Sequence, residues 1–220
     1  RLGEDPTTAD STEYIGLIGW GARLDGDNDS QSSGSGGLLE VTNLDRATVT
    51  GVTCHDAFDA GFLLDTFDDH GVGVPSAATL TDRGYFTGVQ TTACQGEFAT
   101  VLRGPKDCSF SDWVSSNNGR GGILLQGKAF DDADAGTTGD LDDGPAEATQ
   151  NRFVGVRASN NGQSTAADGY GIVSDNATRS SWANGNVNFN PQCAWEFRRT
   201  IGTSGTDGAN QGSYVGFDMR

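Results

Sequence analysis

The residues best suited to acid–base chemistry lie in one short stretch, LLDTFDDHGVGV at residues 63–74. Hydrolysis of a glycosidic bond uses two carboxyl groups, one protonated to assist the leaving group and one ionised to attack or to activate water. Elimination from an acidic sugar instead needs a basic group that removes a proton. Arg198, the first residue of the basic pair in this acidic chain, could bind an anionic sugar, although we favour the alternative that it neutralises neighbouring aspartates. Asp65, Asp69, His70 and Arg198 are therefore the candidate catalytic residues. The alternative for residues 63–74, which we favour, is a solvated acidic loop.

Two further acidic loops offer oxygen ligands for calcium. The first, DGDNDS, places Asp25, Asp27 and Asp29 at alternate positions, but Ser30 and Gly36 stand where an EF-type loop needs Gly and Glu, which favours an ordinary surface loop. For the second loop, at 130–147, a calcium site and a solvated surface loop remain equally open. Its candidate ligands are Asp131, Asp132, Asp134, Asp140, Asp142 and Asp143.

The net charge of −16 comes from 30 acidic and 14 basic side chains. A field of this sign repels nucleic-acid phosphates and anionic lipid headgroups, so we expect neither partner. No run of apolar residues is long enough to span a membrane, so we expect no membrane insertion. Aspartate greatly outnumbers glutamate, and lysine is scarce, as in proteins of extreme halophiles, in which molar salt screens the self-repulsion. We interpret most of these acids as a salt-adapted surface.

The apolar residues alternate over short runs that are separated by Gly, Asn and Asp, a pattern typical of strands rather than helices. Several runs share one frame, in which a first apolar slot is followed three residues later by a second. The first slot holds Val49, Phe86, Phe110, Phe153 and, more loosely, Trp182, and the second holds Val52, Val89, Trp113 and Val156. The run at 212–219 begins a further unit. Repeats of this size predict a solenoid in which each unit buries its apolar face against its neighbours.

One position of the repeat, eight residues after the first slot, favours asparagine. It holds Asn118, Asn161 and Asn190, with Ala57 and Cys94 in the other two units. An asparagine amide both donates and accepts, and its backbone tolerates a left-handed turn. We therefore predict a ladder of side-chain hydrogen bonds from unit to unit; the alternative is that Asn-Gly is ordinary turn chemistry.

Two stretches, YIGLIGWGARLDGDND at 14–29 and GGLLEVTNLDRATVTGVTCHDA at 36–57, resemble the opening of a pectin-lyase-like protein. The resemblance extends from about Tyr14 to Phe197. It implies an all-β fold, namely a right-handed single-stranded parallel β-helix with asparagine-containing turns and acidic loop insertions. It implies little about activity, because lyases, glycosidases, virus tailspikes, adhesins and non-catalytic surface proteins share this architecture.

The stretch at 63–74 resembles the Asp-Asp and Gly-His-Gly elements of polygalacturonase-like hydrolases, but it departs from them. In that family the two elements lie on separate coils, whereas here Asp69 and His70 are adjacent. The Asn-Thr-Asp and Arg-x-Lys elements of the family have no counterpart. The departure weakens the hydrolase interpretation.

The organisation of the chain follows from the same pattern. We expect residues 1–13 to be an extension or linker and residues 14–220 to be one β-helix domain, part of a longer protein. Four cysteines, Cys54, Cys94, Cys108 and Cys193, show no zinc-binding spacing, and neither disulfides nor free buried thiols are excluded.

Three functional hypotheses remain. The first is a non-catalytic module on a cell or virion surface that binds polysaccharide or cell-surface glycan, or builds an appendage. The second is an extracellular polysaccharide lyase or glycosidase that acts in a groove on the β-helix face. The third is cation-dependent assembly into an oligomer, for which the resemblance suggests a trimer. We favour the first because no complete catalytic set is present.

Overall fold

The computed structural model describes residues 15–27, 36–42, 46–65, 83–127, 148–175, 177–198, 213–216 and 218–219. Within these residues the chain is all-β, and every strand pair is parallel. The helical content of this part of the chain is one 3-10 turn, η4, at Ala166–Asp168. The short alternating runs therefore form strands, as the sequence predicted.

Most strands belong to two sheets. The six-stranded sheet contains β2 (Gly37–Thr42), β4 (Ala60–Asp65), β7 (Phe98–Arg103), β10 (Gly121–Gln126), β14 (Tyr170–Asp175) and β18 (Cys193–Arg198). The twelve-stranded sheet contains β1 (Ile15–Asp25), β3 (Ala47–His55), β5 (Tyr85–Thr87), β6 (Gln90–Thr92), β8 (Ser109–Ser111), β9 (Val114–Ser116), β12 (Arg152–Val154), β13 (Arg157–Ser159), β16 (Ser181–Ala183), β17 (Asn186–Asn188), β19 (Ser213–Val215) and β20 (Asp218–Met219). A separate pair is formed by β11 (Ala148–Thr149) and β15 (Ala177–Thr178).

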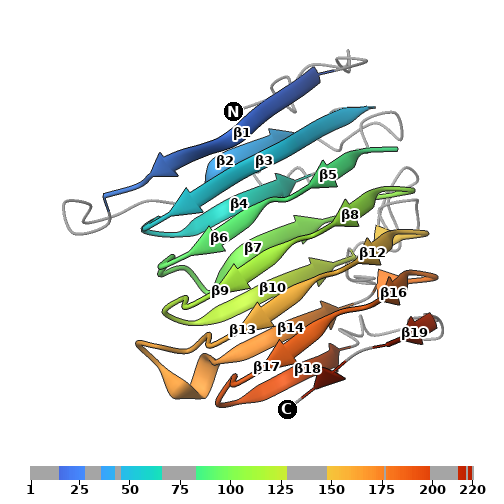
Figure 1. The fold of residues 1–220 in the computed structure, drawn as a ribbon. Helices are drawn as coiled ribbons and strands as arrows, with labels where there is room; N and C mark the ends of the chain where they lie inside the picture. Colours follow the sequence, from blue (N-terminus) through green and yellow to red (C-terminus); the bar gives the residue numbers. More distant parts are fainter. Residues whose placement is uncertain are drawn as a thin grey trace, which may run out of the picture.

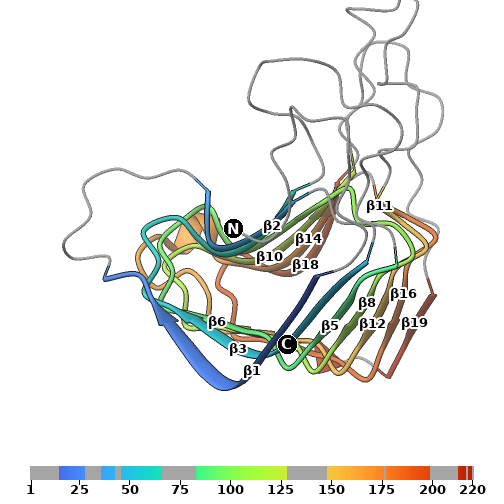
Figure 2. The same cartoon turned by 90° about the horizontal axis from the view of Figure 1, so that it is seen from above.

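The chain passes alternately through the two large sheets, so that the sheets grow together from one end of the molecule to the other (Figure 1). The twelve-stranded sheet is bent along its length into two panels (Figure 2). The first panel contains β5, β8, β12, β16 and β19; the second contains β6, β9, β13, β17 and β20; β1 and β3 cross both. We call one passage through both panels and the following strand of the six-stranded sheet a rung.

The predicted repeat frame is confirmed by the strand register. Val49 pairs with Phe86, and the column continues through Phe110, Phe153 and Trp182. All five side chains are buried. The second-slot residues Val52, Val89, Trp113 and Val156 are also buried, so both apolar slots point into the core. The run at 212–219 contributes β19 and β20, which pair with β16 and β17 as the next rung.

Stacked aromatic rings form the centre of the core. The ring centroids of Phe86 and Phe110 are 4.9 Å apart, those of Phe110 and Phe153 are 4.7 Å apart, and those of Phe153 and Trp182 are 3.7 Å apart. The planes of each pair are within 10° of parallel. Parallel strands place identical slots directly above one another, so aromatic residues in one slot must stack face to face.

The bend between the panels requires a left-handed backbone at one residue of each rung. Gly51, Gly88, Gly155 and Gly216 fill this position with φ of 68°, 64°, 68° and 70°, and Asp112 and Asn184 fill it on two other rungs with φ of 51° and 55°. These are the residue types that adopt positive φ at least cost. The recurring Gly, Asp and Asn residues between the apolar slots therefore fix the angle between the panels.

Candidate functional site

The three asparagines singled out by the repeat lie in one column, on the turn from the second panel to the six-stranded sheet. The side-chain amide of Asn118 donates to Oδ1 of Asn161 at 2.9 Å, and that of Asn161 donates to Oδ1 of Asn190 at 3.0 Å. The column begins at Cys94, whose backbone N–H donates to Oδ1 of Asn118 at 3.1 Å. Asn118 and Asn161 are fully buried. We call these three asparagines the asparagine ladder; they connect rungs, and only Asn190 is partly exposed.

A network of hydroxyl groups extends the ladder into the core. Thr91 Oγ1 lies 2.9 Å from Thr100 Oγ1 and donates to Ser115 Oγ at 2.9 Å. The indole N–H of Trp113 donates to Thr100 Oγ1 at 3.3 Å, and Asn118 donates to Ser115 Oγ at 3.1 Å. Buried polar groups are tolerated where their hydrogen bonds are made, so these contacts account for polar residues at inward positions.

A second column of the same design lies on the turn that precedes the first panel, and the sequence analysis missed it. The left-handed residues there are Arg83, Asp107, Gln150 and Arg179, and each is followed by a buried residue: Gly84, Cys108, Asn151 or Ser180. Asn151 Oδ1 accepts from the backbone N–H of Cys108 at 3.1 Å, as Asn118 does from Cys94. Only one of these four positions is an asparagine, so the sequence shows no repeated residue type here. The column becomes apparent only from the strand register.

The outward face of the second panel is polar along its length. One column of paired positions runs through Arg23, Thr53, Gln90, Val114, Arg157 and Asn186. The neighbouring column runs through Asp25, His55, Thr92, Ser116, Ser159 and Asn188. Arg23, Asp25, Gln90 and Arg157 are exposed, Asn188 at the end of the second column is buried, and Val114 is the one apolar member of the two columns. We call these two columns the polar face.

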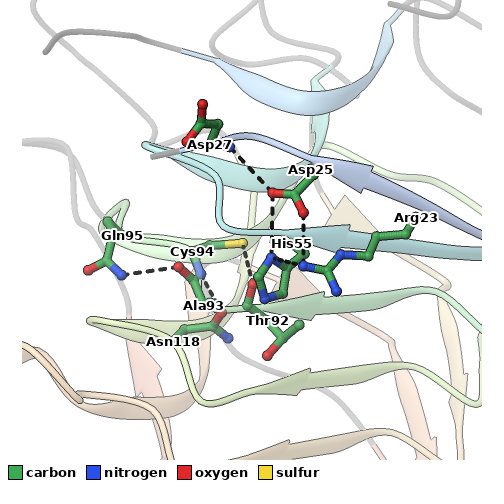
Figure 3. Close-up of polar contacts among 9 residues, drawn as sticks. All are labelled: Arg23, Asp25, Asp27, His55, Thr92, Ala93, Cys94, Gln95 and Asn118. Atoms are coloured by element: carbon green, nitrogen blue, oxygen red, sulfur yellow. Dashed lines mark hydrogen bonds and ion pairs between the residues drawn. The ribbon is translucent and has the colours of Figure 1, made fainter. Parts of the chain in front are cut away.

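Charged side chains converge at the β1 end of the polar face, where β1 pairs with β3 (Figure 3). Arg23 donates to Asp25 Oδ2 at 2.8 Å and to His55 Nδ1 at 2.7 Å. Because a guanidinium only donates, His55 Nδ1 acts as an acceptor in this contact. The backbone N–H of Asp27 adds a longer contact of 3.4 Å to Asp25 Oδ1. The register of β1 and β3 therefore joins residues that are thirty positions apart in the sequence.

Asp25, His55 and Asp56 each offer one ligand atom within 4.8 Å of the others. The arrangement has ligand types suited to a divalent cation. However, Arg23 already contacts both Asp25 and His55, so a cation there would have to displace the guanidinium. The contacts of Arg23 therefore favour a charge-neutralised surface cluster over a metal site.

The contacts around Asp25 lower the pKa of its carboxyl. Partial desolvation raises the pKa of this carboxyl, but the hydrogen bonds from Asp27 and Arg23 and the charge of Arg23 outweigh it, so the pKa lies below its ordinary value. The ionised form therefore stabilises the fold above the unfolded-state pKa, and this contribution is lost as the pH falls through the folded-state pKa. Because Asp25 is half exposed, solvent screening keeps the contribution small.

Replacing Arg23 with glutamine is expected to raise the pKa of Asp25 towards its ordinary value. Carbon-13 NMR titration of the side-chain carboxyl measures this change. Arg120→Gln is the matched control, because Arg120 forms an equivalent ion pair with Asp168 elsewhere. An unchanged Asp25 titration in Arg23→Gln would show that the guanidinium does not control it.

The four cysteines are free thiols. Burial, with a smaller effect of Cys94, raises the pKa of Cys54 to about 12, and burial raises the pKa of Cys94 to about 11. Cys108 is also buried, whereas Cys193 is only partly buried. The possibility of disulfides that the sequence left open is therefore not realised in this structure.

Thiol labelling of the folded protein is expected to modify Cys193 first. At about pH 8 the thiols of Cys54 and Cys94 remain protonated, and the thiolate is the reactive form. Cys54, Cys94 and Cys108 are also buried away from the reagent. Mass spectrometry after timed labelling, compared with labelling in denaturant, measures the order. Labelling of Cys54 as fast as Cys193 in the folded state would contradict the burial described here.

The structure places two of the candidate catalytic residues on one edge of the six-stranded sheet. Asp65 ends β4 and Arg198 ends β18, and paired positions connect them through Arg103, Gln126 and Asp175. Four strand spacings of about 4.8 Å separate their backbones by roughly 19 Å. Two groups that act on one glycosidic bond lie within about 10 Å of each other. Asp65 and Arg198 thus share an edge without forming a pair.

The remaining sequence candidates lie outside the described residues. They are Asp69, His70, Asp29 and the six aspartates of the 130–147 loop. Trp113 and Trp182 belong to the core, as expected, whereas Trp20 is 90% exposed at the bend of β1. His55 was not among the candidates. The feature that could have identified it is its position at the end of β3, where it pairs with Asp25 at the end of β1.

Comparisons with protein-family models, with curated proteins and with solved structures found no match. The class that the structure defines is therefore an all-β protein built from parallel sheets. In the described part of the chain, no helix has the length and apolar character needed to cross a membrane.

Proposed function

We propose that this chain is a module of a right-handed parallel β-helix that is displayed on a cell or virion surface and recognises glycans without catalysis. Three features support the β-helix: the chain alternates between the two sheets, all described strand pairs are parallel, and the asparagine ladder connects successive rungs. The polar face carries the functional part of the proposal, because it combines guanidinium, amide and hydroxyl groups on neighbouring rungs.

A sugar chain is recognised by many hydrogen bonds to its hydroxyl groups, and exposed amides, hydroxyls and arginines supply them. Neighbouring rungs lie about 4.8 Å apart, so a glycan lying across the strands meets similar groups at each step. Gln90, Ser116 and Arg157 are successive members of this path. The first panel supports recognition less well, since Val154, Ala183 and Val215 occupy part of one of its outward columns, next to Thr50, Thr87 and Ser111.

Binding to a panel of host-surface and cell-wall polysaccharides in molar salt tests the proposal. Arg157→Ala is expected to weaken binding roughly tenfold or more, because loss of an interface arginine costs on the order of 2 kcal/mol. Arg152→Ala is the matched control: Arg152 is exposed on the same rung but belongs to the first panel. Equal losses in the two variants, or no binding to any polysaccharide, would refute recognition by the polar face. Release of reducing sugar or unsaturated product would replace the non-catalytic proposal with the enzymatic one.

The same proposal includes adaptation to high salt. The Debye length falls from about 10 Å at 0.1 M to about 3 Å at 1 M salt, which screens repulsion among the charges of a chain with net charge −16. We expect the melting temperature to rise over this range, as measured by circular dichroism. A zwitterionic osmolyte at equal osmolality is the control. A melting temperature that is independent of salt would contradict the interpretation.

A further inference from the structure

The chain contains three Asn-Gly pairs in two different environments. Asn118-Gly119 and Asn161-Gly162 belong to the asparagine ladder, and Asn184-Gly185 lies at the bend between β16 and β17. An Asn-Gly pair is chemically labile because glycine, without a Cβ, lets its backbone nitrogen approach the side-chain amide carbon. The environment of each pair therefore decides whether this reaction proceeds in the folded protein.

In both ladder pairs the side-chain amide and the backbone nitrogen of the following glycine make hydrogen bonds. Asn118 and Asn161 are buried, and their side chains donate and accept within the ladder. The backbone N–H of Gly119 donates to the carbonyl of Cys94 at 2.8 Å, and that of Gly162 donates to the carbonyl of Asn118 at 3.0 Å. A nitrogen fixed in this way cannot turn towards the side chain.

Asn184 has the opposite environment. Its side chain is exposed and makes no hydrogen bond to the described part of the chain. Its backbone is held at the bend, with φ of 55° and a hydrogen bond of 2.9 Å to the carbonyl of Val215. The N–H of Gly185 donates no hydrogen bond within the described residues, although its carbonyl accepts from Asp218 at 3.1 Å. Neither reacting group therefore has a hydrogen-bond partner among the residues that the structure describes.

We propose that Asn184 is a site of spontaneous deamidation, whereas the two ladder asparagines are protected by the fold. The Gly185 nitrogen loses its proton and bonds to the Asn184 side-chain carbonyl carbon, the bond to the amide nitrogen breaks, and ammonia leaves. Water then opens the resulting five-membered imide at either carbonyl. The products are aspartate and isoaspartate at position 184, and no oxidant or other co-reactant is needed.

The product changes the bend where the first and second panels meet. It adds one negative charge to a chain that is already acidic, and isoaspartate lengthens the backbone by one carbon. The bend occupies the same register as Gly155 on the preceding rung, and the new charge falls on the exposed side chain of residue 184, although Gly185 beside it is buried. The modified protein is therefore expected to remain folded.

The test is a timed incubation of the full chain in molar salt at alkaline pH, followed by peptide mapping with mass spectrometry. The expected result is a progressive exchange of amide for carboxylate in the peptide that contains Asn184, with Asn118 and Asn161 unchanged. The same incubation in denaturant is expected to modify all three. A slower reaction at mildly acidic pH follows from the need to remove the Gly185 proton.

Asn184→Gly is the control variant, because glycine occupies this bend position on four other described rungs and the variant is expected to fold. Its only change is loss of the modification at position 184. Two results would overturn the proposal: modification of Asn118 or Asn161 in the folded protein at the rate of Asn184, or modification of Asn184 only after unfolding.

Discussion

Replacing Phe153 with alanine is expected to lower the free energy of unfolding by about 4 kcal/mol. The ring of Phe153 lies between Phe110 at 4.7 Å and Trp182 at 3.7 Å, and it is fully enclosed. Alanine would leave a cavity across two rung interfaces, which rigid neighbouring strands cannot close. Denaturant unfolding followed by circular dichroism measures the loss.

The consequences of this substitution extend beyond the site. In a protein built from stacked units, stability is a sum of unit and nearest-neighbour terms. Weakening the interface at Phe153 is therefore expected to broaden the transition or divide it into two steps. Tyr85→Ala is the control, because this aromatic residue points outward from β5 and is 61% exposed; it should change stability by about 0.5 kcal/mol or less. A loss below about 1 kcal/mol for Phe153→Ala would refute the stacked core.

Replacing Asn161 with alanine is expected to cost about 3 kcal/mol, because buried donors and acceptors lose their partners. Asn161 accepts from Asn118 at 2.9 Å and donates to Asn190 at 3.0 Å and to the Ser115 carbonyl at 3.3 Å. Asn160→Gly is the matched control. Asn160 is the exposed left-handed neighbour with φ of 60°, so glycine should change stability by less than about 1 kcal/mol.

Asn161→Asp separates the donor role from the shape of the side chain. The introduced carboxylate would face two acceptors, Asn190 Oδ1 and the Ser115 carbonyl, so at neutral pH the loss should equal or exceed that of Asn161→Ala. Burial raises the folded-state pKa of the new carboxyl above its unfolded value. The destabilisation relative to the parent protein should therefore shrink as the pH falls through that pKa. A loss independent of pH would contradict a donor role for this side chain.

The sequence predicted the features that depend on local pattern. Alternating apolar residues in short runs gave the strand type, and the spacing of Phe86, Phe110 and Phe153 gave the register that the strand pairs confirm. The offset of eight residues placed Asn118 and Asn161 in one column, where hydrogen bonds connect them. These features recur on several rungs in the same frame, so each occurrence supports the prediction for the others.

Features that occur once, or that depend on the distance between rungs, could not be predicted. Arg23, Asp25 and His55 meet only because β1 pairs with β3 in one register, and nothing in either segment alone indicates it. The column of Cys108 and Asn151 was missed because its residue types vary from rung to rung. The distance between Asp65 and Arg198 could not be predicted, because it depends on how many strands lie between them in the sheet.

Hydrogen exchange of the asparagine side-chain amides tests the central claim most directly, namely that a buried asparagine column ties the parallel rungs together. In nitrogen-15 NMR spectra of the folded protein, the Nδ2 protons of Asn118 and Asn161 are expected to exchange slowly, because each is buried and hydrogen bonded. Those of the exposed Asn184 are expected to exchange at the rate of an unfolded chain. Exchange of Asn118 and Asn161 as fast as that of Asn184 would contradict the ladder and the stacking that depends on it.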